Sequence, residues 1–270
     1  MIFRKLVLIA NNGTKDNFLP AVTLDIKHWK QYFSSAEGGA WESNEITEFY
    51  NDCDKTTLKD YIQQFDKVNV WAIVFCGHGY AKQTANGTIE TILELSPGNE
   101  CKVSSIKNWL QNKQSIIIAD SCRKVYPVVS TLVNITDMLP IQRMLSESSE
   151  KTYRKACRQI FLKNAYRNGR TYCVEGYAAS LGECAHDDDR KGGYYSTSLM
   201  LEGLNCISKL KGNRKNILSS NKEIVGSFSS VHDQVIERVN SLSVTTYNEP
   251  QHPTREKGNY WPFYVIPQMF

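Results

Sequence analysis

The chain has 270 residues, of which 41% are hydrophobic and 22% are charged, and its formal net charge is +4. This length and apolar content suffice to bury the core of one large domain, which excludes an intrinsically disordered chain. Positive and negative side chains are interspersed, and no apolar run reaches membrane-spanning length. We therefore expect a single domain over residues 1–270 that contacts neither nucleic acid nor a membrane.

The predicted elements, in chain order, alternate between strands and helices. The first apolar run, residues 6–10, is too short for the core of a signal peptide and predicts a buried strand. Apolar side chains at helical spacing follow in residues 20–33, and Asn86-Gly87 predicts the turn of a hairpin within residues 83–94. Further strands are predicted at 45–50, 68–75, 116–119, 172–179 and 261–266, and further helices at 54–65, 103–112, 140–168, 194–204 and 231–242.

This alternation indicates the fold class. Strands that alternate with helices form mostly parallel sheets that are covered on both faces. We therefore expect an α/β/α sandwich with a mostly parallel central sheet. The strongly charged helical segment after the fourth strand is expected to form an insertion around residues 136–170.

The eight cysteines form no Cys-x-x-Cys pair, which argues against a zinc ribbon or a thioredoxin-type motif. An even number of cysteines is compatible with disulfides, but Cys76 lies in an apolar run that is typical of a buried strand. We therefore expect reduced thiols, as in the cytoplasm.

Two of the apolar runs end abruptly in a reactive side chain. The first ends in His78, between Gly77 and Gly79, and the second ends in Cys122, directly after Asp120-Ser121. Functional residues of parallel sheets gather at the carboxyl ends of the strands. We predict that Cys122 is a nucleophile and His78 its general base. The alternatives are a buried structural cysteine and a loop histidine without a function.

The glycines beside His78 favour the functional interpretation. Glycine allows a tight turn and lets a substrate approach the backbone closely. We expect the N–H groups of Gly79 and Cys122 to form an oxyanion hole. No third side chain that would orient His78 is evident, so the prediction is a His–Cys dyad.

The strings FCGHG (75–79) and ADSCR (119–123), each after an apolar strand, resemble the catalytic motifs of the caspase-like cysteine peptidases. Residues 19–25 resemble the start of the first helix in bacterial caspase homologues and metacaspases. Residues 182–204 resemble their strand-then-helix passage, and Gln251-His252-Pro253 resembles their closing motif. The resemblance covers nearly the whole chain and implies the caspase-like α/β/α sandwich.

The sequence around Cys122 resembles metacaspases more than caspases. Caspases carry Gln-Ala-Cys at the nucleophile, whereas this chain has Asp120-Ser121-Cys122, which is the metacaspase-like form. The chain departs from metacaspases directly after the cysteine, where they have a small residue and glycine and this chain has Arg123-Lys124. By resemblance, Asp25 and Asp120 fall where metacaspases hold the acids that bind Arg or Lys before the cleaved bond. The alternatives are a surface position for Asp25 and a turn-forming role for Asp120.

No cofactor is expected. Calcium activates some metacaspases, and the adjacent acids Asp187-Asp188-Asp189 could in principle bind it. Adjacent acids more often form a solvated loop, and calcium needs six or more oxygen ligands. Basic residues within 140–170 offer sites for self-processing. The apolar spacing there favours an uncleaved helical insertion instead.

Together these features predict a cytoplasmic cysteine endopeptidase that cleaves protein substrates after Arg or Lys. The resemblance to bacterial relatives implies a regulated-death or antiphage pathway and an activating partner chain. The alternative is an inactive caspase-like interaction module, although the chain keeps both His78 and Cys122. A third possibility, another thiol enzyme such as an acyl transferase, lacks a cofactor- or carrier-binding signature.

Overall fold

A six-stranded sheet forms the centre of the computed structural model, which describes residues 2–84, 86–124, 147–166, 171–212, 223–256 and 260–268. All neighbouring strands are parallel except at one edge, where the last strand is antiparallel. Across the sheet the order is β12 (Thr254–Arg255), β8 (Cys173–Tyr177), β7 (Gln114–Asp120), β3 (Val68–Gly77), β1 (Phe3–Asn11) and β2 (Ile46–Tyr50).

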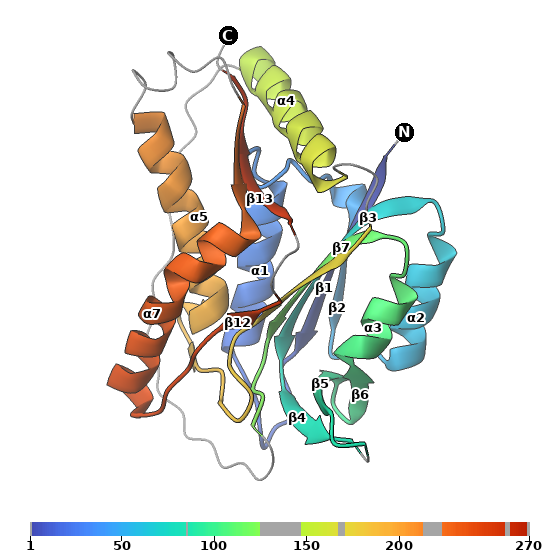
Figure 1. The fold of residues 1–270 in the computed structure, drawn as a ribbon, viewed down its shortest axis with the longest axis vertical. Helices are drawn as coiled ribbons and strands as arrows, with labels where there is room; N and C mark the ends of the chain where they lie inside the picture. Colours follow the sequence, from blue (N-terminus) through green and yellow to red (C-terminus); the bar gives the residue numbers. More distant parts are fainter. Residues whose placement is uncertain are drawn as a thin grey trace.

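Helices cover both faces of this sheet (Figure 1). One face carries α2 (Lys55–Gln64) and α3 (Val103–Trp109), and the other carries α1 (Ala21–Ser34), α5 (Tyr194–Gly212) and α7 (Phe228–Tyr247). These layers form the α/β/α sandwich with a mostly parallel sheet that the sequence predicts.

The central strands bury both of their faces. Leu6 and Leu8 of β1 pack in the cluster that contains α1, whereas Val7 and Ile9 pack in the cluster that contains α2. The side chains of a strand point alternately to opposite faces, so a strand covered on both sides needs apolar residues at every position. This requirement explains the continuous apolar runs of β1, β3 and β7.

Smaller elements lie outside the central sheet. The hairpin predicted within 83–94 is larger than expected and belongs to a three-stranded sheet, and the last predicted strand pairs with a strand that was not predicted. These elements are η1 (Ser43–Glu45), β4 (Gly79–Gln83), β5 (Ile89–Ser96), β6 (Asn99–Lys102), α4 (Glu147–Ala165), β9 (Asp187–Asp188), β10 (Gly192–Gly193), β11 (Ile224–Ser227) and β13 (Pro262–Ile266).

The predicted insertion around residues 136–170 is described only over residues 147–166, where it forms α4. Residues 136–146 and 167–170, with several of the basic residues considered for self-processing, lie outside the described residues. Among the helices that the structure describes, none has the length and apolar character needed to cross a membrane. All eight cysteines are free thiols.

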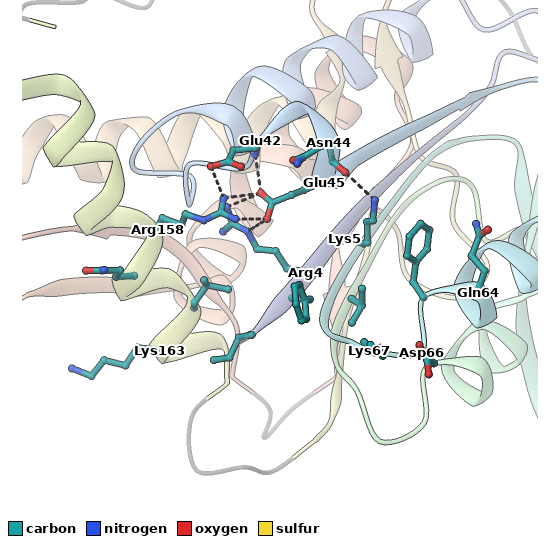
Figure 2. A pocket seen from close by; sticks show the side chains of 16 residues that line it. Arg4, Lys5, Glu42, Asn44, Glu45, Gln64, Asp66, Lys67, Arg158 and Lys163 are labelled. Carbon is teal, nitrogen blue, oxygen red and sulfur yellow. Dashed lines mark hydrogen bonds and ion pairs between the residues drawn. The ribbon is translucent and has the colours of Figure 1, made fainter. Parts of the chain in front are cut away.

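A buried ion-pair cluster joins α4 to the amino end of the central sheet (Figure 2). Arg4 of β1 donates to both carboxylate oxygens of Glu45 at 3.0 Å, and Arg158 of α4 donates to the same carboxylate at 2.8 Å. The cluster lines a groove of about 920 Å³. The groove lies at the opposite end of the strands from the predicted active site, so we assign the cluster a structural role.

We expect Glu45→Gln to lower the free energy of unfolding at neutral pH by about 3 kcal/mol, because the buried Arg4 loses its counter-charge. Burial acts to raise the pKa of Glu45, but the hydrogen bonds from Arg158 and Arg4 outweigh it and the pKa is lowered. A carboxylate with a lowered pKa stabilises the fold above its unfolded pKa and loses that effect as the pH falls through its folded pKa. The wild type should therefore lose stability in acid.

Denaturant unfolding of the wild type and Glu45→Gln from neutral pH into acid measures both effects. Glu48→Gln is the matched control, because the ion pair of Glu48 with Lys30 lies at the surface. Equal stability of Glu45→Gln and the wild type at neutral pH would contradict the assigned role.

Candidate active site

The structure places His78 and Cys122 at the carboxyl ends of two neighbouring strands. β3 and β7 are parallel, and Cys76 pairs with Asp120 at the end of their register. His78 lies two positions after Cys76, and Cys122 lies two positions after Asp120. The fold therefore delivers the imidazole and the thiol to adjacent loops at one edge of the sheet.

Gly79 allows these two loops to touch. A β-carbon at this position would lie 2.7 Å from Ser121 Oγ and 2.9 Å from the carbonyl oxygen of Ile92. Both distances are too short, so a larger residue would push Ser121 and the adjoining Cys122 away. The close approach keeps the backbone of Gly79 beside the nucleophile loop, where an oxyanion hole made from both loops requires it.

A backbone carbonyl orients His78. The Nε2 atom of His78 lies 2.7 Å from the carbonyl oxygen of Asn17, in the loop that follows β1. A carbonyl oxygen only accepts, so Nε2 carries the proton and Nδ1 is the basic nitrogen. Gly13 makes room for this contact, since its φ is +79° and a β-carbon there would lie 2.6 Å from His78 Nε2.

The carbonyl of Asn17 is thus a third member of the site, beside His78 and Cys122, and it orients the imidazole. The sequence did not predict it. Any residue supplies a backbone carbonyl, so the sequence holds no signature for it. The nearest local signal in the sequence is Asn11-Asn12-Gly13, whose residue types favour a turn directly after the first strand.

The thiol of Cys122 is hydrogen-bonded to a backbone carbonyl and not to His78. Its Sγ donates to the carbonyl oxygen of Ala185 at 3.5 Å, and no hydrogen bond joins it to the imidazole, although the structure describes both side chains. A hydrogen bond with the Cys184 thiol and burial raise the pKa of Cys122 well above its ordinary value. The site is therefore in a resting geometry, with the nucleophile protonated.

Arg123 holds the loop that follows the nucleophile. Its guanidinium donates to Thr91 Oγ1 at 3.0 Å, to the carbonyl of Ala179 at 3.2 Å and to Thr254 Oγ1 at 3.1 Å. It also lies over the Tyr177 ring, 4.1 Å from its centre. The loop that departs from the metacaspase pattern is thus tied to three strands through a nearly buried cation.

Asp25 and Asp120 lie together in the interior. Asp25 is 2% exposed and accepts from the Gly193 N–H, and Asp120 is 7% exposed and accepts from the Ser196 N–H. Burial raises the pKa of both carboxyls, and the Asp120 charge raises that of Asp25 further. The alternative of a surface position for Asp25 is therefore wrong.

Asp187 belongs to the same acidic cluster, which the sequence analysis did not recognise. Burial, and then the charges of Asp189 and Asp120, raise its pKa to about 6. Asp187 pairs with Gly193 across the β9–β10 hairpin, and Gly193 bonds Asp25. The hairpin thus brings a residue from a supposedly solvated loop to the buried acids.

Among the residues that the structure describes, no cation forms an ion pair with this acidic cluster. The ion pairs found within the described ranges involve none of Asp25, Asp120 and Asp187. The part of the chain that the structure describes also contains no group of three or more His, Cys, Asp or Glu arranged to hold a metal ion.

Gln251 joins the two ends of the segment that carries Cys184 and Ala185. Its fully buried side chain donates to the carbonyl of Ala178 at 3.0 Å and accepts from the His186 N–H at 3.0 Å. From the sequence, Gln251 was noted only as part of a motif that resembles the family. Its physical role became visible only when the fold brought both ends of the segment to one side chain.

The model of the caspase domain family matches residues 4–255. The chain belongs to the caspase family. The solved structure of caspase-1 from Spodoptera frugiperda is similar over 96% of this chain and 90% of that chain, with a TM-score of 0.54 and 12% sequence identity. At this identity the likeness shows the caspase fold alone. No curated protein sequence matches the chain.

Membership in the caspase family confirms the resemblance stated from the sequence and supports a cysteine peptidase. The caspase fold also confirms the predicted fold class. The roles of His78, Cys122, Gly79, Asp25 and Asp120 remain predictions, and the geometry described above is the basis on which they are proposed.

Proposed function

We propose that this caspase-family chain is a cysteine endopeptidase with Cys122 as nucleophile and His78 as general base. One observation carries the proposal. The pairing of Cys76 with Asp120 brings the two reactive residues to adjacent loops, at positions where the carbonyl of Asn17 already orients the imidazole. A histidine held in this tautomer has its basic Nδ1 available for a proton.

The reaction begins when the thiol of Cys122 turns from the carbonyl of Ala185 to His78. A substrate N–H that bonds to this carbonyl would release the thiol. His78 Nδ1 then takes the thiol proton, and the sulfur attacks the scissile carbonyl carbon. The N–H groups of Gly79 and Cys122 stabilise the oxyanion.

His78 next gives its proton to the leaving amine, and the C–N bond breaks to leave a thioester on Cys122. Water attacks the thioester with His78 again as the base, which releases the carboxylic acid and restores the thiol. The thiol and the imidazole supply both the nucleophile and the proton transfers, so the proposed reaction requires no cofactor.

The acidic cluster supports cleavage after Arg or Lys. Burial raises the pKa of Asp25, Asp120 and Asp187, and the charge of Asp120 raises the pKa of the other two further; none of the three has a cationic partner among the described residues. A guanidinium or ammonium group placed among them would relieve this repulsion and form charge-assisted hydrogen bonds. Asp187 is the least buried of the three and would contact the substrate first.

The resting geometry also supports a latent enzyme. The thiol donates to a backbone carbonyl and not to its base, and two of the three acids are nearly inaccessible. Activation by a partner chain, as expected from bacterial relatives, would have to turn the thiol and open the β9–β10 hairpin.

A panel of fluorogenic peptides with Arg, Lys, Gln or Asp before the cleaved bond tests the proposal. We expect cleavage after Arg and Lys only. A peptidyl chloromethyl ketone with Arg at this position should alkylate Cys122 and block the reaction, and peptide mapping would locate the adduct.

Each other result has a defined meaning. Cleavage after Asp would keep the peptidase and overturn the assignment of the acidic cluster. Neither cleavage nor labelling, in the presence and absence of calcium, would leave two choices, a latent protease that awaits its activating partner or the inactive interaction module. Labelling without hydrolysis would favour another thiol enzyme.

A further inference from the structure

A second thiol faces the nucleophile. The Arg123 N–H donates to the carbonyl of Glu183 at 2.9 Å, and the Gly182 N–H donates to the carbonyl of Arg123 at 2.9 Å. The two segments therefore run antiparallel beside each other. The bond between Arg123 and Glu183 places Cys122, which precedes Arg123, beside Cys184, which follows Glu183, and the two thiols are hydrogen-bonded to each other.

The neighbouring positions of Cys122 and Cys184 suit a disulfide bond. Residues that face each other on antiparallel chains have Cα atoms about 4.5–5.5 Å apart and project their side chains on the same side. A disulfide needs a Cα separation of roughly 4.4–6.8 Å. The bond from Cys122 Sγ to the carbonyl of Ala185 shows that the nucleophile already points toward the Cys184 segment.

The surroundings of Cys184 favour its thiolate. Its hydrogen bond with Cys122 acts against burial and, with the nearby Lys124 ammonium, lowers the pKa of Cys184 to about 7. Lys124 is held in place by Glu249 at 3.0 Å. The other thiols with resolved shifts have raised pKa values, so Cys184 is the most readily ionised of these cysteines.

We propose that Cys122 and Cys184 form a reversible disulfide when the protein meets a peroxide. The Cys184 thiolate attacks one oxygen of hydrogen peroxide, the O–O bond breaks, and the products are a sulfenic acid and hydroxide, which becomes water with the proton left by the thiol. The Cys122 sulfur then attacks the sulfenic sulfur, and the sulfenic oxygen leaves as a second water. Two electrons pass from the sulfurs to the peroxide, and a dithiol reductant reverses the bond.

The disulfide occupies the sulfur that the proposed peptidase needs as its nucleophile. Oxidation would therefore stop proteolysis, and it would also protect Cys122 from irreversible oxidation to the sulfinic acid. The effect on activity rests on the proposed function, whereas the formation of the bond does not. Chemical mapping and activity are therefore measured separately.

Mapping comes first. Hydrogen peroxide is added to the wild type, to Cys184→Ala and to the control Cys206→Ala. Each protein is then alkylated and digested without reductant, and the peptide masses are measured by mass spectrometry. We expect a linked pair of peptides that contain Cys122 and Cys184 in the wild type and in the control, lost after dithiothreitol. In Cys184→Ala, we expect sulfinic acid at Cys122 instead.

The result for the wild type alone decides whether the disulfide forms, so the mapping experiment remains valid if a variant folds poorly. Sulfinic acid at Cys122 without a linked pair would overturn the proposal, as would a disulfide to any other cysteine.

Activity is compared with the untreated sample of the same protein. Peroxide should abolish cleavage in the wild type and in Cys206→Ala, and dithiothreitol should restore it. In Cys184→Ala the loss should be permanent. A linked pair in a protein without peptidase activity would contradict only the proposed function, whereas an active peptidase that forms no linked pair would contradict only the disulfide.

Discussion

Cys122→Ala is expected to abolish peptide cleavage, and His78→Ala is expected to lower kcat by about 10²–10⁴-fold. Alanine at position 122 removes the sulfur that forms the thioester. Alanine at position 78 removes the group that accepts the thiol proton and later protonates the leaving amine. The measurement is kcat and KM on the best Arg or Lys peptide, with the fold checked by circular dichroism.

His252→Ala is the matched control for the base. His252 is a half-exposed histidine whose Nδ1 lies 2.7 Å from Glu183 Oε1, so it has a carboxylate partner but no place in the proposed reaction. Its variant should keep the wild-type kcat. Undiminished cleavage by His78→Ala, or equal losses in His78→Ala and His252→Ala, would contradict the assignment of the base.

Asp25→Asn is expected to change activity and stability in opposite directions. Cleavage after Arg and Lys should fall roughly tenfold to a hundredfold in kcat/KM, the equivalent of about 1.5–3 kcal/mol for a hydrogen bond to a charged group. The asparagine keeps a carbonyl oxygen to accept from the Gly193 N–H, so the local structure should persist. The loss would then report the charge.

The stability of the same variant should rise at neutral pH. The folded pKa of Asp25 is raised by burial and by the Asp120 charge. A carboxyl with a raised pKa contributes its stability below the unfolded pKa, and that contribution is lost as the pH rises through the folded pKa. We expect Asp25→Asn to remove this loss and raise Tm by about 2–4 °C for each kcal/mol gained.

Thermal unfolding from about pH 4 to neutral pH measures the effect, because the wild type should lose stability over this range and the variant should lose less. Asp188→Asn is the control, since Asp188 lies at the end of the same hairpin but faces Lys191 at 3.9 Å. If Asp25→Asn were less stable than the wild type at every pH, the carboxylate would be structural and the proposed pocket would be wrong.

Most of the fold could be predicted because its signals are local. The apolar runs of β1, β3 and β7 and the helical spacing of α1 and α2 depend only on neighbouring residues, and the structure has these elements at nearly the predicted bounds. The short strands β9, β10 and β12 were not predicted, because they contain two residues each and their pairing partners are distant or glycine-rich. Such strands have no periodicity to detect.

The candidate site divides in the same way. His78 and Cys122 could be proposed from the sequence because reactive side chains after buried strands are a local pattern, and parallel strands end at one edge. Asn17, Asp187 and Cys184 could not be proposed, since each acts through a contact made by folding. In a sequence, nothing distinguishes the backbone carbonyl of Asn17 from any other carbonyl, Asp187 from the two acids that follow it, or Cys184 from the other seven cysteines.

The sequence by itself determined the α/β class, the family resemblance and the two reactive residues. The tertiary structure decided which carbonyl orients the imidazole, which acids are buried together and which thiol faces the nucleophile. The physical reason is that propensity and periodicity act over a few residues, whereas hydrogen-bond direction, desolvation and charge coupling depend on groups that meet only in the folded chain.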